Sequence, residues 1–136
     1  MSAIRILFVE DSREDVFLAQ YDLNHAGIDS ESHTVDDESS LRHELETWEP
    51  DLIVSDSMVP GFDGFKAFEI SRELAPDVPF VFRTGRARDE RSIHALEQGA
   101  RGWVGKTNRN EFVALVMNAI SAAREAVSIE TSALDS

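Results

Sequence analysis

The sequence predicts an α/β fold in which one parallel sheet has helices on both faces. Short apolar segments alternate five times with segments whose apolar residues recur at helical spacing. The clearest of the apolar segments are continuous, which is typical of strands that are buried on both faces. A chain of 136 residues has room for one sizeable core, so all five units belong to one sheet, with right-handed crossovers between its strands.

Five strands are expected in order along the chain. The first, third and fourth are short apolar segments that end in polar residues. The second is weaker, and the fifth is short and bounded by glycine. Their ranges are Ile4–Val9, Ser32–Val35, Leu52–Ser55, Pro79–Arg83 and Gly102–Gly105.

A helix is expected after each strand. Gly27 and Gly99 end the first and fourth helices, Asp36 or Asp37 caps the second before Pro50, and a Pro-Gly loop precedes the third. The apolar residues that define the five helices are Val16, Ala19, Leu23 and Ala26; Leu41, Leu45 and Trp48; Phe65, Phe68 and Leu74; Ile93 and Leu96; and Phe112, Leu115, Val116, Ala119, Ile120 and Ala123.

These elements predict one domain over residues 1–125. Residues 126–136 are then a short, loose tail that is too small for an output domain, and no pair of helices suited to DNA binding is found. The chain has no cysteine, which excludes disulfides and thiolate metal sites. No apolar segment approaches the ~20 residues that cross a bilayer, and the start lacks the layout of a signal peptide, so the cytoplasm is the default location.

The net charge of −13 bears on the partners of the chain. Binding to nucleic acid or to an anionic membrane depends on Lys and Arg, so neither is expected as a partner. The acidic excess leaves two interpretations open. The source is halophilic and its salt screens the repulsion, or the protein is simply acidic.

Polar side chains follow four of the five predicted strands. Glu10 and Asp11 come after the first strand, Asp56 after the third, Thr84 after the fourth and Lys106 after the fifth. In an open parallel sheet, ligands bind outside the carboxyl ends of the strands. We therefore expect these five side chains to share one rim of the sheet, although they span most of the sequence.

The chemistry of this set favours phosphoryl transfer. Three carboxylates at one point repel one another unless a divalent cation lies between them, and their oxygen ligands suit Mg²⁺ (or Mn²⁺). One carboxylate can then attack a phosphorus atom and become an acyl phosphate. The Lys106 ammonium would bind a phosphoryl oxygen as a point charge, and the Thr84 hydroxyl would donate to another.

The same residues give the chain a resemblance to the response regulator receiver family, over roughly residues 4–124. The residues that carry it are Glu10-Asp11, Asp56 in the segment DSMVPGFDG, Thr84-Gly85 and Lys106. The resemblance implies a flavodoxin-like (βα)5 fold with strand order 2-1-3-4-5. It also implies that a histidine kinase or a small phosphodonor phosphorylates Asp56, so that the chain is a stand-alone signalling protein and no enzyme in the usual sense.

The resemblance also implies the ligands of the metal ion. Asp11 would be the main acidic ligand, and Glu10 would act directly or through water. Asp56 itself and the backbone carbonyl of Met58 would complete the protein ligands.

Further roles follow from the resemblance for the switch. Thr84 would move toward the phosphoryl group, and Trp103 matches the aromatic switch position, although a tryptophan there is more often simply part of the core. Met58 and Arg86 lie where the family tunes the lifetime of the phosphoryl group. The face formed by the fourth helix, fifth strand and fifth helix would then change its affinity for an unknown downstream protein, with the chain a monomer or a phosphorylation-dependent dimer.

The chain departs from the family pattern after Lys106. Most relatives have a proline there, in a cis peptide, whereas this chain has Thr107. A cis bond before a non-proline residue costs about 2.5–4 kcal/mol. The Lys106–Thr107 bond is therefore trans with the loop moved, or cis with the strain retained.

Three other functions compete with this interpretation. A degenerate receiver would bind partners without being phosphorylated. A phosphatase of the haloacid-dehalogenase type needs a second aspartate two residues after the nucleophile, where this chain has Met58. A flavin-binding module needs a phosphate-binding loop after the first strand, where Glu10 and Asp11 would repel phosphate. Separately, the cluster Arg83, Arg86, Arg88 and Arg91 is interpreted as a solvated face with local ion pairs. The alternative is that some of these arginines meet an acidic partner surface after phosphorylation.

Overall fold

The structure is a computed structural model that describes residues 3–135. Its main sheet has five parallel strands in the order β2-β1-β3-β6-β7, which is the order that the resemblance implied. The strands are β1 (Ile4–Val9), β2 (Ser30–Val35), β3 (Leu52–Ser55), β6 (Phe80–Thr84) and β7 (Gly102–Gly105). A short antiparallel pair, β4 (Met58–Val59) and β5 (Phe62–Asp63), follows β3 and was not predicted.

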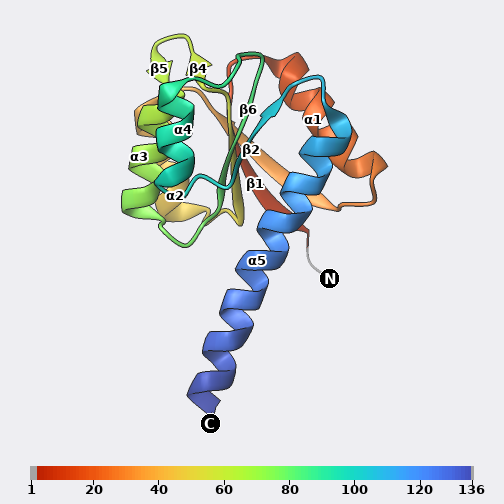
Figure 1. The fold of residues 1–136 in the computed structure, drawn as a ribbon, viewed down its shortest axis with the longest axis vertical. Coiled ribbons are helices and arrows are strands. Elements are labelled where there is room, and N and C mark those ends of the chain that lie inside the picture. The colour runs from red at the N-terminus through yellow and green to blue at the C-terminus, as the bar shows by residue number, and fades with distance from the viewer. Residues whose placement is uncertain (1–2, 136) are drawn as a thin grey trace.

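Five helices cover the two faces of the sheet (Figure 1). They are α1 (Arg13–His25), α2 (Glu38–Thr47), α3 (Gly64–Leu74), α4 (Glu90–Glu97) and α5 (Arg109–Asp135). Helices α2, α3 and α4 pack on one face, and helices α1 and α5 pack on the other. The predicted α/β fold is therefore confirmed.

Alternation along the strands explains why the apolar segments are continuous. In β1, Leu7 and Val9 belong to the core under α2, α3 and α4, whereas Ile6 and Phe8 belong to the core under α1 and α5. Successive side chains of a strand point to opposite faces, so a strand that is covered on both sides needs apolar residues at every position.

Side-chain caps mark where helices begin, as at α1, α2 and α4. The Ser12 side chain accepts from the N–H of Asp15 at the start of α1, and the Asp37 side chain accepts from the N–H of Ser40 at the start of α2. Helix α4 begins with a reciprocal capping box between Asp89 and the residue three positions later. These bonds satisfy amide groups that the helices cannot pair internally. Of the two caps that the sequence offered for α2, Asp37 is the one used.

Helix α5 is longer than predicted. The helical backbone runs to Asp135 and projects beyond the sheet (Figure 1), whereas a loose tail was expected over residues 126–136. No glycine or proline follows Gly105, so the sequence contains no residue that would end the helix. Ser136 lies outside the described residues. Within residues 3–135, no helix combines the length and the apolar character needed to cross a membrane.

Candidate functional site

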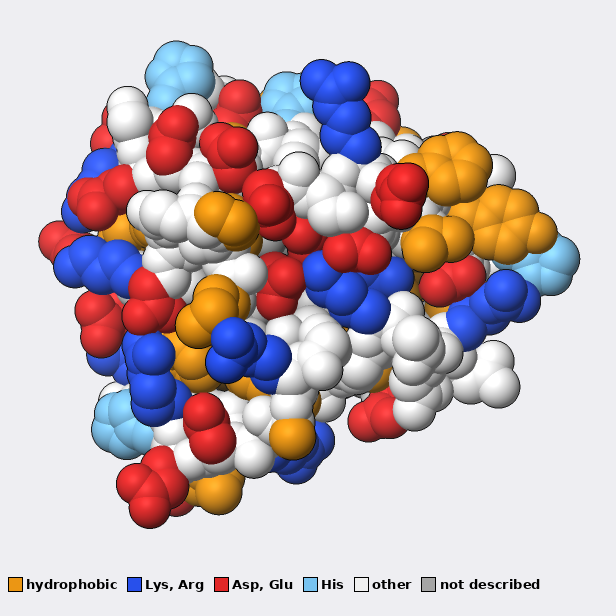
Figure 2. Space-filling model, turned by 90° about the horizontal axis from the view of Figure 1, so that it is seen from above, with side chains coloured by type: hydrophobic (Ala, Val, Ile, Leu, Met, Phe, Trp, Pro, Cys, Tyr) orange, Lys and Arg blue, Asp and Glu red, His pale blue; other side chains and the backbone are white. Residues whose placement is uncertain are grey.

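The carboxyl ends of the parallel strands bring the predicted residues to one rim. The ladder of backbone hydrogen bonds continues one residue beyond β1, β3 and β7. The amide of Glu10 donates to Val35, that of Asp56 to Val9 and that of Lys106 to Thr84, at 3.0, 3.0 and 3.1 Å. These bonds fix Glu10 and Asp56 after neighbouring strands and hold Lys106 beside the end of β6. Figure 2 shows acidic and basic side chains gathered in the middle of this face.

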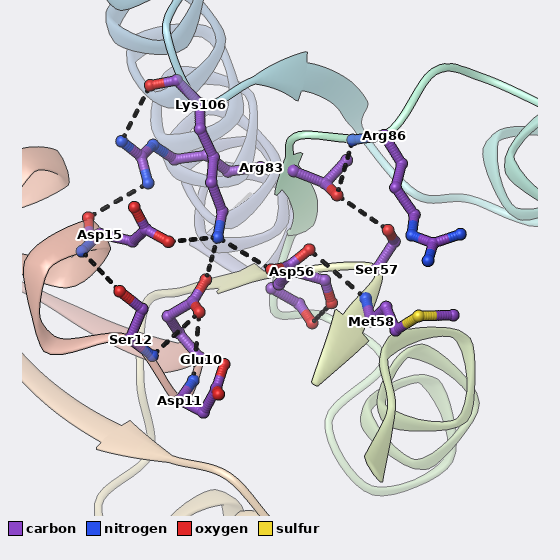
Figure 3. Close-up of polar contacts among 12 residues, drawn as sticks. Glu10, Asp11, Ser12, Asp15, Asp56, Ser57, Met58, Arg83, Arg86 and Lys106 are labelled. Atoms are coloured by element: carbon purple, nitrogen blue, oxygen red, sulfur yellow. Dashed lines mark hydrogen bonds and ion pairs between the residues drawn. The ribbon is translucent and has the colours of Figure 1, made fainter. Parts of the chain in front are cut away.

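Lys106 is the centre of the polar cluster. Its Nζ lies 2.9 Å from Glu10 Oε2, 2.9 Å from Asp56 Oδ2 and 2.6 Å from Asp15 Oδ2 (Figure 3). The side chains are largely sheltered from water, with 18% of Lys106, 12% of Asp56 and 6% of Glu10 exposed. One ammonium therefore neutralises carboxylates that would otherwise repel one another at short range.

Burial and the ammonium act in opposite directions on the acidic groups. Burial raises the pKa of Glu10, and bonds from Lys106 and from the Ser12 amide only partly offset it. Burial also acts to raise the pKa of Asp56, but the bond and charge of Lys106 outweigh it and hold that pKa below its usual value. For Lys106, burial acts to lower the pKa, but its bonds to the three carboxylates raise it. Asp56 is thus an ionised carboxylate beside a permanent cation at neutral pH.

The remaining oxygens of the two buried carboxylates face backbone amides. Glu10 Oε1 accepts from the amides of Asp11 and Ser12 at 3.2 and 3.1 Å. Asp56 Oδ1 accepts a long bond of 3.4 Å from the amide of Met58. The Asp11 side chain is exposed at the same rim (Figure 3). Each buried carboxylate therefore has one oxygen on the ammonium and one on the backbone.

The predicted metal ligands are of the chemical type that a magnesium ion prefers. They consist of carboxylate oxygens and a backbone carbonyl, without nitrogen or sulfur ligands, and such hard oxygen donors suit Mg²⁺. Over residues 3–125, whose side chains the structure describes, no three acidic or histidine side chains are arranged as a ready cation site. Instead, the Lys106 ammonium lies where the oxygens of Glu10 and Asp56 converge. The metal site remains a prediction from the sequence.

A second chain of contacts leads from Asp56 toward the α4 side of the sheet. Thr84 is buried, and its hydroxyl lies 2.9 Å from that of Ser57, the residue after Asp56. The Thr84 hydroxyl also accepts from the amide of Arg86 at 3.2 Å. The sequence did not single out Ser57, because a serine in a loop carries no signal of its own.

Trp103 closes this chain of contacts. Its indole N–H donates to the Arg86 carbonyl at 3.1 Å, and its ring lies 5.2 Å from that of Phe82 and 6.0 Å from that of Phe65. Only 7% of the residue is exposed, so Trp103 is a core residue with one polar bond to the loop after β6. Thr84 and Trp103 therefore both bond to the backbone of Arg86, Thr84 to its amide and Trp103 to its carbonyl.

The arginine cluster divides into buried and exposed members. Arg91 fits the predicted solvated face, because it is exposed and lies 2.5 Å from Asp63. That interpretation is wrong for Arg83, which is 4% exposed. Strand alternation was the available signal, since Arg83 lies two residues after Val81 and shares its face under α1 and α5.

At Lys106, the structure adds one partner that the sequence did not predict and decides the conformation of the following peptide bond. Asp15 was not singled out, although it lies in the first turn of α1, directly after the expected rim residues. No cis peptide bond occurs within residues 3–135, so the Lys106–Thr107 bond is trans. A residue other than proline favours trans by several kcal/mol, about 3 in peptides, which accounts for this choice.

Comparisons with known proteins agree with this geometry. The family model described as response regulator receiver domain matches residues 6–117. The transcriptional activator protein IrlR of Burkholderia pseudomallei is 34% identical over 131 residues, covering 96% of this chain and 55% of IrlR. The phosphate regulon transcriptional regulatory protein PhoB of Escherichia coli is 33% identical over 144 residues, covering 98% of this chain and 61% of PhoB. The chain thus spans somewhat more than half the length of these relatives.

Solved structures show the same fold. A CheY-like response regulator receiver domain protein from Methanospirillum hungatei superposes with a TM-score of 0.79 at 21% identity, covering 92% of this chain and 99% of that one. A response regulator receiver domain protein from Clostridium thermocellum gives a TM-score of 0.77 at 20% identity, covering 90% and 98% of the two chains.

Proposed function

Because the chain belongs to the response regulator receiver family, we propose that it accepts a phosphoryl group on Asp56 from a histidine kinase or a small phosphodonor. The observation that carries the proposal is the contact of 2.9 Å between Asp56 Oδ2 and the Lys106 ammonium. It combines a carboxylate with a lowered pKa and a cation that can bind a phosphoryl oxygen.

In the proposed reaction, Asp56 is the nucleophile. One of its carboxylate oxygens forms a bond to phosphorus, while the bond from phosphorus to the donor breaks and the donor leaves with that electron pair. The phosphoryl oxygens then lie within reach of the Lys106 ammonium and the Thr84 hydroxyl.

The rim also offers ligands for a divalent cation. Glu10, Asp11 and Asp56, with the backbone carbonyl of Met58, would hold Mg²⁺ or Mn²⁺. When bound, such an ion would neutralise negative charge on the transferring phosphoryl group. Lys106, which lies between Glu10 and Asp56 in the structure, would keep Asp15 as its partner.

The signal would leave the site through the loop after β6. If Thr84 turns toward the phosphoryl group, its bonds to Ser57 and to the Arg86 amide must change, and Trp103 is attached to the same Arg86. The face of α4, β7 and α5 would shift with them. A downstream protein reads the change only if its affinity differs between the two states, whether the chain acts as a monomer or forms a dimer on phosphorylation.

The chain is a signalling domain, and any chemistry that it performs would act on its own Asp56. The similar proteins IrlR and PhoB are named as transcriptional regulators, but this chain spans little more than half of each. From the net charge of −13, which disfavours contact of these residues with DNA, we propose a protein as their target. A phosphorylation-independent interaction module is the alternative that the following experiment separates.

Incubation with acetyl phosphate and Mg²⁺ tests the proposal. The intact mass is expected to rise by one phosphoryl group, and omission of Mg²⁺ or addition of a chelator should prevent the change. The matched control is Asp56→Asn, which preserves the size of the side chain but removes the nucleophile. An unchanged mass of the wild type, or equal labelling of the variant, would defeat the assignment.

Replacing Arg86 with alanine is expected to shorten the lifetime of the acyl phosphate. Figure 3 shows Arg86 and Met58 on the same side of Asp56, where a guanidinium can hold the phosphoryl group or screen it from water. Because the contacts of Arg86 with Thr84 and Trp103 use its backbone, the substitution leaves them in place. An exposed charge pair of ~0.5–1 kcal/mol predicts a half-life about two to five times shorter.

The half-life is measured as the decay of the phosphorylated mass after the donor is removed. Arg101→Ala is the matched control, because Arg101 is exposed and its amide bonds to Phe80 at the opposite end of β6. Equal half-lives of the wild type and Arg86→Ala would exclude a role for the guanidinium.

A further inference from the structure

Arg83 occupies a position where the fold calls for an apolar side chain. It lies in β6 and shares the strand face of Val81, under Phe112 and Val116 of α5. Only 4% of Arg83 is exposed, and burial lowers its pKa against the opposing charges of nearby carboxylates. Arginine is almost never buried unless it is paired, because a charge without partners is costly to remove from water. The partners of this guanidinium therefore need an explanation.

The guanidinium binds two backbone carbonyls and one aromatic ring. Nη1 donates to the carbonyl of Asp15 in the first turn of α1, and Nη2 donates to the carbonyl of Lys106 in the turn after β7, both at 3.2 Å. Its Cζ lies 5.2 Å from the centroid of the Phe112 ring. The planar fork of an arginine can hold two separate acceptors at a set spacing, which a lysine cannot do.

The two carbonyls belong to the two residues whose side chains meet at the rim. Lys106 Nζ and Asp15 Oδ2 are 2.6 Å apart, and Arg83 joins the backbone carbonyls of the same two residues (Figure 3). Backbone and side-chain contacts thus close a ring of three residues from β6, α1 and the turn after β7. Within this ring, the Lys106 backbone cannot move without breaking a bond to Arg83.

We propose that Arg83 is a positioning residue that holds the Lys106 backbone so that the ammonium stays against Asp56. Most relatives have a proline directly after the lysine, and its ring restrains the backbone there, whereas this chain has Thr107. The bond from the Arg83 guanidinium to the Lys106 carbonyl restrains the same turn in another way. The consequence for phosphoryl transfer rests on the proposed function. The placement of Lys106 does not, and it can be tested without any phosphodonor.

The chain offers an internal reference for this test, because Lys66 and Lys106 are its only lysines and Lys66 is exposed. Trace acetylation of the folded full chain with acetic anhydride, followed by peptide mapping, gives the ratio of modification at Lys106 to that at Lys66. In the wild type, Lys106 is expected to be strongly protected. In Arg83→Met, loss of two charge-assisted bonds should raise the ratio by about tenfold, with Lys66 unchanged.

Val116→Ala is the matched control, because it loosens the same core face without touching Lys106. An unchanged ratio in Arg83→Met, or an equal rise in Val116→Ala, would overturn the proposal. If Arg83→Met does not fold, Arg83→Lys keeps the charge but loses the fork. The new lysine maps to a different peptide, and the ratio of Lys106 to Lys66 is expected to rise in the same way.

The phosphorylation rate supplies the second readout. Displacement of a reacting group by about 1 Å can cost a hundredfold in rate, so Arg83→Met should be labelled by acetyl phosphate at least about ten times more slowly than Val116→Ala. Equal rates would contradict a positioning role. Failure of the wild type to be labelled would defeat the proposed function, while the lysine ratio would still decide whether Arg83 positions Lys106.

Discussion

Replacing Lys106 with methionine is expected to slow phosphorylation of Asp56 by about a hundredfold, the usual cost of losing one electrostatic donor at a transition state. The ammonium lies 2.9 Å from Asp56 Oδ2, close enough to bind a phosphoryl oxygen when one is attached there. Methionine has a similar length but no charge, so the effect isolates the ammonium. The rate of mass increase with acetyl phosphate measures it.

The same substitution should destabilise the metal-free protein. Glu10 and Asp56 are largely buried, and Asp15 is partly so, and all three would lose the cation that neutralises them. Removing one partner of a buried ion pair costs about 3–5 kcal/mol, and partial exposure reduces this to about 2–3 kcal/mol here. Added Mg²⁺ should restore part of the loss, because it binds the folded state alone.

The loss of stability should depend on pH in a defined direction. The folded pKa of Asp56 lies below its usual value, so its ionisation adds stability above an unfolded pKa of about 3.9 and this contribution disappears as the pH falls. Without Lys106, that contribution is absent. The difference between wild type and variant is therefore largest near neutral pH and shrinks only as the pH falls below about 3.9, through the lowered folded pKa of Asp56.

Urea unfolding at both pH values measures these differences. Lys66→Met is the matched control, since it removes the only other lysine from an exposed position and should change the unfolding free energy by less than about 0.5 kcal/mol. If Lys106→Met were as stable as Lys66→Met near neutral pH, the ammonium would not neutralise the rim.

The convergence of the rim could be predicted from the sequence because it depends on topology alone. In a parallel sheet, the residues that follow the strands lie at one rim, so Asp56 and Lys106 were expected on the same rim once the strands were assigned. The family resemblance added the strand order, which periodicity cannot supply. The roles of Asp56 and Lys106 in phosphoryl transfer remain predictions.

What could not be predicted depends on contacts between side chains of different elements. Asp15 makes the shortest ion pair with Lys106, at 2.6 Å, because α1 docks against the turn after β7. Arg83 was misassigned because a charged residue is normally exposed, and only its partners in α1 and that turn explain its burial. Helix α5 continues past the range that its apolar stripe predicted, because neither glycine nor proline follows Gly105 in the sequence.

Gly64 packs directly against the backbone of Asp56 and Ser57, and replacing it with alanine should lower the stability markedly. A Cβ built at Gly64 would lie 2.1 Å from the backbone oxygen of Asp56 and 2.8 Å from the Cα of Ser57. These are backbone atoms, so no side chain can move to make room. The Gly64 amide also donates to the Ser57 carbonyl at 3.1 Å, which holds α3 against this segment.

Two effects of Gly64→Ala oppose each other. Alanine is better than glycine in a helix by about 0.8–1.0 kcal/mol, and Gly64 begins α3. Overpacking costs about 1–3 kcal/mol where side chains can adjust, and more where the backbone must shift. We therefore expect a net loss of about 2 kcal/mol or more in the free energy of unfolding, together with slower labelling of the displaced Asp56.

Gly85→Ala is the matched control for Gly64→Ala, because it adds the same methyl group where no other atom is close. A Cβ at Gly85 meets nothing within 4 Å, and the residue is exposed. Urea unfolding should place Gly85→Ala within about 0.5 kcal/mol of the wild type. If Gly64→Ala were at least as stable as Gly85→Ala, helix propensity would outweigh the clash. The start of α3 would then not fix the position of the Asp56 carbonyl.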